Sequence, residues 1–141
     1  MLIQLIISTL MVLLTVAIHG AGLLYLARLL RLEKRDEQFE HISPISLQGI
    51  SVTFCVVIAL FVLHGIEIWL YAALYLIVHA MPDLQMAVYF STITYSTIGY
   101  DDGGISAAWS LVAAIEGING VILLGWSTGF FVSLVGRLHS R

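Results

Sequence analysis

Residues 91–102 read STITYSTIGYDD and form a compact polar stretch between two long apolar runs. Ser and Thr fill most of its first seven positions, and two aspartates end it. The chain as a whole is 60% hydrophobic, and only 11% of its residues are charged. Non-helical backbone is tolerated at membrane depth only where it is buried in protein or lines a wet cavity. The stretch therefore predicts a polar passage inside an otherwise apolar protein.

The flanking runs predict an all-α integral membrane protein with three transmembrane helices in a lipid bilayer. Residues 1–27 contain no Asp, Glu, Lys or Arg, the run 42–82 contains only Glu67, and the run 103–136 contains only Glu116. About 20 apolar helical residues cross the hydrocarbon core of a bilayer, so each run can span it. A cleaved signal peptide is the less favoured alternative for the first run, because no basic flank precedes it and RLLRLEKR follows it.

The cations predict the orientation of the helices. All six lie either between the first two runs or at the C-terminus: Arg28, Arg31, Lys34, Arg35, Arg137 and Arg141. Positively charged loops remain cytoplasmic. We therefore expect a cytoplasmic linker at 33–43, a cytoplasmic C-terminus and an N-terminus outside.

Helix signals divide the rest of the chain. The first helix is predicted over 1–32 and the second over 44–80, after the start signal Ser43-Pro44. Pro82 and Asp83 then favour a new helix over 82–95, which is too short to span a membrane and is a re-entrant candidate. The last helix is predicted over 107–136.

The segment after the short helix has the composition of an ion-binding backbone. Rings of backbone carbonyls, with a threonine hydroxyl at the inner end, replace the water around a permeating cation. Glycine lets the backbone turn so that successive carbonyls point the same way. Because one chain supplies only a quarter of such a ring, a homotetramer is implied.

The run Ser96-Thr97-Ile98-Gly99-Tyr100-Asp101-Asp102 resembles the T-x-G-Y-G-D signature of potassium-channel selectivity filters. The resemblance covers residues 44–136 as outer helix, pore helix, filter (96–102) and inner helix, and Trp109 fits the start of the inner helix. The chain looks like a short prokaryotic pore-loop potassium channel. Its pore domain would span 44–141, with the first helix as an addition, in the inner membrane of the cell.

The resemblance implies specific roles for the filter residues. Thr97 would bind K⁺ through its hydroxyl and carbonyl, and Ile98, Gly99 and Tyr100 through their carbonyls, with no cofactor besides the permeant ions. The ring of Tyr100 would pack on aromatic residues of the pore helix. The supporting residues would be Tyr89, Phe90, Thr94 and Ser96, and the outer mouth would carry Asp101 and Asp102.

Two positions depart from the signature. Asp101 replaces the second glycine, at a position where the backbone conformation costs an ordinary residue 1–2 kcal/mol and penalises Asp and Asn least. A weakly selective Na⁺/K⁺ channel is therefore an alternative. Ile93 stands where some relatives carry a carboxylate behind the filter, so Asp102 needs another partner, for which the Tyr89 hydroxyl is a candidate.

Polar and glycine residues of the last helix have more than one interpretation. An ionisable side chain such as that of Glu116 has a high free-energy cost at membrane depth. It could hydrogen-bond behind the filter, line the cavity as a negative ring, or pair with Asn119. Gly117 and Gly120 are either packing positions or a gating hinge. The series Gly125, Gly129 and Ser133 has the small-xxx-small spacing of close helix contacts.

His64 and Glu67 share a helix face and predict a structural hydrogen-bonded pair. An intramembrane metal or proton site formed by His64, Glu67 and Glu116 is the alternative, whereas His19 is interpreted as a satisfied polar residue. The chain has no nucleophile–base set, Walker loop or Cys/His cluster, so we expect neither an enzyme nor a nucleic-acid partner. Only five residues follow Gly136, so a ligand-binding gate would need an unidentified regulatory subunit. A non-conducting accessory subunit is a further alternative.

Overall fold

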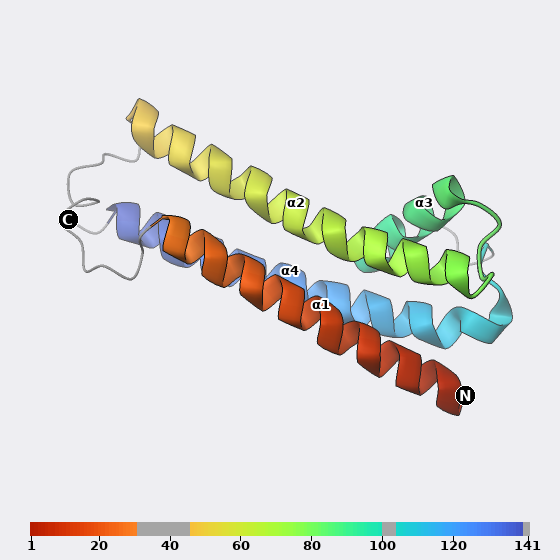
Figure 1. The fold of residues 1–141 in the computed structure, drawn as a ribbon. Helices are drawn as coiled ribbons and strands as arrows, with labels where there is room; N and C mark the ends of the chain where they lie inside the picture. The colour runs from red at the N-terminus through yellow and green to blue at the C-terminus, as the bar shows by residue number, and fades with distance from the viewer. Residues whose placement is uncertain (31–45, 100–103, 140–141) are drawn as a thin grey trace.

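The computed structural model describes residues 1–30, 46–99 and 104–139. These residues form helices and no strands: α1 (Leu2–Leu29), α2 (Leu47–Ile77), α3 (Leu84–Tyr95), a short 3₁₀ helix (Ala107–Trp109) and α4 (Ser110–His139) (Figure 1). Helices α1 and α2 and the stretch Ala107–Gly136 are long and apolar enough to cross a membrane. The prediction of an all-helical membrane protein with three spanning helices is confirmed at this level.

The three long helices lie side by side. Helices α1 and α4 run in the same direction and α2 runs in the opposite one, so the N-terminus and the start of α4 lie at the same end (Figure 1). Packing joins α1 to both α4 and α2. The side chain of Gln4 also donates to the carbonyl of Ala108, which ties the beginnings of α1 and α4 together. Helix α1 is therefore an integral part of the bundle.

Helix α3 lies at the same end and runs back along α2 (Figure 1). The Ser91 hydroxyl donates to the carbonyl of Ile68 at 2.9 Å, and the Tyr95 hydroxyl donates to Glu67. Because Tyr95 is the last residue of α3, the helix ends beside the middle of α2, deep in the bundle.

Side-chain caps set the beginnings of α2 and α3. Ser46 caps α2 by accepting from the Gly49 amide at 3.1 Å, and Ser43 and Pro44 lie outside the described residues. Asp83 caps α3 by accepting from the Met86 amide at 2.9 Å, so the helix begins at Leu84. The predicted start at residue 82 was two residues early, because the carboxylate of Asp83 satisfies a free amide of the first turn from outside the helix.

The buried core has two parts. One lies between α2, α3 and α4, and its fully buried members include Tyr71, Tyr75, Ala87 and Val112. The other joins α1, α2 and the far end of α4 through Leu23, Leu26, Val56, Leu60 and Leu134. The first part fixes α3 in place and therefore positions the segment that follows it.

Candidate functional site

The C-terminal end of α3 is closed by a backbone turn. Ser96 is the C-cap, and Thr97 follows it in the left-handed region at φ 58°. The Thr97 amide donates to the Thr94 carbonyl at 3.0 Å, and the Ile98 amide donates to the Ile93 carbonyl at 2.9 Å. This pair of bonds is a Schellman motif, which satisfies the otherwise free carbonyls at the end of a helix.

The same turn aligns two carbonyls. The Gly99 amide also donates to the Ile93 carbonyl, at 3.1 Å, so the amides of Ile98 and Gly99 point at one oxygen. In a trans peptide the C=O points opposite to the N–H of the same unit. The carbonyls of Thr97 and Ile98 therefore both point away from α3, on the exposed side of the chain.

Thr97 and Gly99 both adopt the left-handed region, with φ angles of 58°. The physical reason is that the last carbonyls of α3 need donors, and the nearest donors are the amides of residues 97–99. The left-handed region costs a β-branched residue such as Thr97 roughly 1–2 kcal/mol. Strain of this kind is typical of functional sites in proteins.

Tyr100, Asp101 and Asp102 lie outside the described residues, so their predicted contacts with the aromatic residues of α3 stay predictions. The Tyr89 side chain is exposed. The Phe90 ring is buried and packs edge-on against Tyr75, with ring centroids 5.5 Å apart.

Ser96 and Thr94, the other two predicted supporting residues, have different surroundings. The Ser96 hydroxyl donates to the Thr92 carbonyl of its own helix at 2.7 Å. Thr94 lines an open cavity of about 550 Å³ together with Thr97, Gly99 and Gly117 of α4. This cavity adjoins the aligned carbonyls.

Glu116 is buried against α3. Its carboxylate accepts from the hydroxyls of Ser91 and Tyr75. The structure thus brings Glu116 to the back of α3 and not to Asn119, whose amide donates to the Thr15 hydroxyl at 2.8 Å and to the Tyr71 hydroxyl at 3.3 Å. A carboxylate of α4 therefore contacts α3 through Ser91.

A second buried carboxylate, Glu67 of α2, contacts α3 one helical turn beyond Ser91, at Tyr95. Its Oε1 lies 2.8 Å from His19 Nδ1, and its Oε2 lies 3.3 Å from His64 Nδ1 and accepts from the Tyr95 hydroxyl. The Ser127 hydroxyl of α4 contacts both imidazoles, at 3.2 Å from His19 Nε2 and 3.0 Å from His64 Nε2. His64 and Glu67 are thus in contact, as the sequence predicts.

Sequence reasoning missed the role of His19 in this group. The candidate triad had Glu116 as its third member, whereas the structure brings His19 to His64 and Glu67. A signal was present in the first helix, because Ser8, Thr15 and His19 share one face at helical spacing. The structure buries all three.

The glycines of α4 divide into close contacts and open positions. A Cβ at Gly120 would lie 2.1 Å from the Tyr95 carbonyl oxygen, and one at Gly117 would lie 3.4 Å from that of Thr94. The structure therefore favours packing over a hinge at Gly120, whereas a Cβ at Gly117 would make only an ordinary van der Waals contact. Among the described residues, no atom of another element lies within 4 Å of a Cβ at Gly125 or Gly129, so these residues do not make the close contact expected there.

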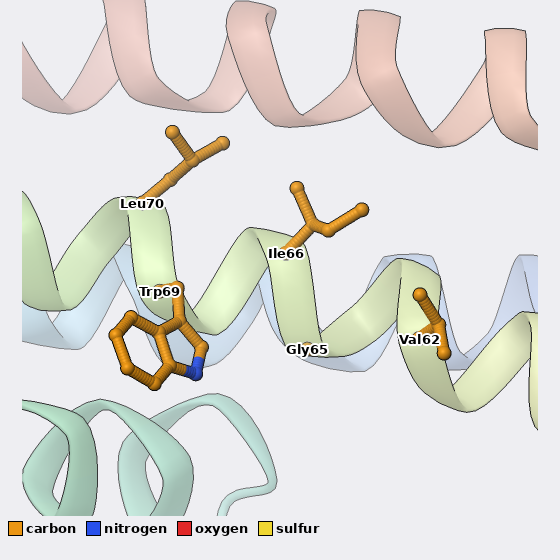
Figure 2. Close-up of a pocket in the computed structure, with 5 residues that line it drawn as sticks. All are labelled: Val62, Gly65, Ile66, Trp69 and Leu70. Carbon is orange, nitrogen blue, oxygen red and sulfur yellow. The ribbon is translucent and has the colours of Figure 1, made fainter.

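The outer side of α2 is apolar. A shallow cavity of about 580 Å³ is lined there by Val62, Gly65, Ile66, Trp69 and Leu70. In Figure 2, Trp69 projects on the side of α3, and Ile66 and Leu70 project on the side of α1. This face suits contact with lipid, because the residues that line the cavity carry no charged or metal-binding side chain.

Comparison with known proteins gives one match. A family model described as an ion channel matches residues 57–137, which is more than half of the chain and includes most of α2, all of α3 and nearly all of α4. No curated protein and no solved structure matches the chain. The three apolar helices and this match together show that the chain belongs to the ion channel family and is an integral membrane protein that forms a transmembrane ion channel.

Proposed function

We propose that four copies of this chain form a passive potassium-selective channel, in which α3 is the pore helix and residues 97–101 form the filter. The observation that carries the proposal is the pair of carbonyls at Thr97 and Ile98, which point to one side directly after the end of α3. Carbonyl oxygens stacked in this way replace the hydration shell of a cation.

The position of α3 supports the proposal. Its C-terminal end lies beside the middle of α2, where a spanning helix crosses the centre of a bilayer, so α3 would re-enter the membrane. The C-terminal end of a helix carries partial negative charge and favours a nearby cation. Both buried carboxylates accept hydrogen bonds from α3 side chains, which hold this end in place.

Potassium is proposed over other cations because Thr97, Gly99 and Tyr100 occupy the positions of the filter signature. Asp101 favours the second candidate, a weakly selective cation channel, because it replaces a glycine of that signature. Paired aspartates from four chains would also raise the cation concentration at the mouth.

A bilayer recording with K⁺ on one side and Na⁺ on the other tests the proposal. For a selective channel we expect a reversal potential close to the K⁺ equilibrium potential. Equal permeabilities would favour the weakly selective channel, and no flux at any voltage or pH would favour an accessory subunit. The variant Asp101→Gly is the matched comparison. An unchanged selectivity would show that Asp101 is a tolerated substitute for glycine and does not affect which ion is conducted.

A further inference from the structure

Five polar side chains from all four helices form a closed ring in the interior of the bundle. In order around the ring they are Glu67, His19, Ser127, His64 and Tyr95, and each contacts the next. His19 and Glu67 are fully buried, and the His64 side chain is 13% exposed. Most groups of the ring are buried, so unpaired protons or charges within it are costly.

If both imidazoles are neutral and the Glu67 carboxylate is ionised, the ring is one positive charge short. Two neutral imidazoles, one phenol and one serine hydroxyl supply four protons, and an ionised carboxylate supplies none. These four protons cannot fill the five contacts of the ring. The Glu67 carboxylate also leaves one negative charge buried, which is costly without a cation. A bound cation would correct both deficits.

The geometry suits a metal ion. A hydroxyl oxygen accepts two hydrogen bonds, so Ser127 Oγ can accept from the Nε2–H groups of both histidines, at 3.2 and 3.0 Å. Both Nδ1 lone pairs are then free to face Glu67. Metal-binding histidines typically have their second nitrogen fixed in this way by a hydrogen-bond partner.

The ligand distances agree with this assignment. One ligand atom from each of His19, His64 and Glu67 lies within 4.8 Å of the other two. Ligands held about 2.0 Å from a tetrahedral Zn²⁺ are separated by about 3.3 Å. The two histidines approach different oxygens of Glu67, at 2.8 Å (His19 Nδ1 to Oε1) and 3.3 Å (His64 Nδ1 to Oε2). Both separations lie near that value, so small shifts of the carboxylate and the imidazoles would admit the ion.

We propose that His19, His64 and Glu67 bind a divalent transition metal of the Zn²⁺ class, with the Tyr95 oxygen as the fourth ligand. Two imidazoles and a carboxylate suit Zn²⁺. Loss of the Tyr95 hydroxyl proton on binding leaves the four-ligand site neutral, so uptake releases that proton to solvent. The metal joins α1 and α2 to the last residue of α3. The proposal does not depend on the ion that the channel conducts.

Metal analysis of the full-length protein, purified in detergent without chelator, tests the proposal. We expect one transition-metal ion per chain by mass spectrometry of the elements. After removal of the metal, Co²⁺ should restore the site and give the strong visible absorption of a four-coordinate ion. Glu67→Gln and His19→Gln should weaken Co²⁺ binding by at least about tenfold. His79→Asn is the matched control, because His79 is exposed at φ 52°, where Asn is tolerated.

Two results would overturn the proposal. Wild-type protein that remains metal-free and colourless after Co²⁺ loading would mean that a fifth proton completes the ring. Equal Co²⁺ binding by wild type and His19→Gln would place the metal elsewhere. If His19→Gln fails to fold, His19→Cys keeps a ligand and should add a near-ultraviolet sulfur-to-cobalt band, whose absence also contradicts the site. Potassium flux is measured separately, so a metal-binding protein without flux would refute only the proposed function.

Discussion

Gly120 marks the closest approach of α4 to the end of α3 among the described glycines. A Cβ there would lie 2.1 Å from the carbonyl oxygen of Tyr95 and 2.9 Å from its carbonyl carbon. Both atoms belong to backbone, which cannot rotate away as the end of a side chain can. The absence of a side chain at Gly120 therefore allows α3 to end where it does.

Replacing Gly120 by Ala should separate α4 from α3. We expect a loss of about 1–3 kcal/mol in the free energy of unfolding in mixed micelles, as for overpacking of a tight interior, together with reduced current. Gly65→Ala is the control, because no atom of another element in the described part of the chain lies within 4 Å of a Cβ there. The gain in helix propensity should make that variant neutral or up to about 1 kcal/mol more stable. Equal stability of the two variants would contradict the close contact.

Individual residues were only partly predictable from the sequence. Gly99 in the left-handed region agrees with the expected use of glycine, but Thr97 in the same region was not foreseen, because a β-branched residue rarely adopts it. Sequence reasoning also left the choice between hinge and packing open at Gly120. That choice depends on the distance between two helices, which no local pattern records.

Helix α3 is fixed by hydroxyl groups on one of its faces. Ser91 and Tyr95 are four residues apart, and each donates to a carboxylate from a different long helix, Glu116 of α4 and Glu67 of α2. Hydrogen bonds to charged groups are worth more than neutral ones. The two bonds therefore determine the depth and rotation of α3, and with them the direction of the carbonyls that follow.

Ser91→Ala should loosen this attachment. Loss of the hydroxyl leaves Glu116 with one buried donor fewer, so we expect about 1–3 kcal/mol less stability. Denaturant unfolding in mixed micelles measures the change. Ser51→Ala removes an exposed hydroxyl that bonds only its own helix, to the Leu47 carbonyl, and should change stability by less than about 0.5 kcal/mol. If the two variants unfold alike, the bond to Glu116 does not hold α3.

The existence of the helices was easier to predict than which face of each helix packs against which neighbour. Long uncharged runs and the start signal around Pro82 indicated all four, because length and capping are local properties. The polar residues of the first helix were harder to interpret. Thr15 and His19 pair with residues more than 40 positions away, so their partners depend on how α1 is rotated against α2 and α4.

At the scale of the whole molecule, one chain leaves its carbonyl segment and one side of α4 uncovered. Ile98, Ile118, Val121 and Ile122 are more than half exposed. The open cavity lined by Thr97 and Gly117 adds to the uncovered surface. A ring of carbonyls around an ion needs several chains, and oligomers are commonly symmetric. These surfaces are the expected contacts between copies.

Native mass spectrometry of the protein released from detergent tests the number of copies. We expect a mass of about four times the 15.5 kDa chain, because four carbonyl segments close a ring of the size that replaces the water around K⁺. Ile118→Glu and Val121→Glu should lower the mass to that of smaller species, since a charge in an apolar contact is costly. Ile58→Glu, on the exposed side of α2, is the control. A dominant monomer or dimer in the wild type would contradict the tetramer.

Helix α1 completes the interior of its own subunit, and a chain of residues 31–141 should therefore fail to assemble. Without α1, Glu67 loses His19 and Asn119 loses Thr15. Removing a hydrogen-bond partner from a buried polar group typically costs about 1–3 kcal/mol, and more for a charged group, which is a large share of the stability of a small domain. Co-expression of residues 1–35 as a separate chain should restore assembly and current, measured by size-exclusion chromatography and bilayer recording. The same segment carrying Thr15→Val and His19→Leu should restore neither, because it returns the apolar surface without the polar partners. A chain of residues 31–141 that assembles and conducts like the full protein would show that α1 is an addition to a self-sufficient pore.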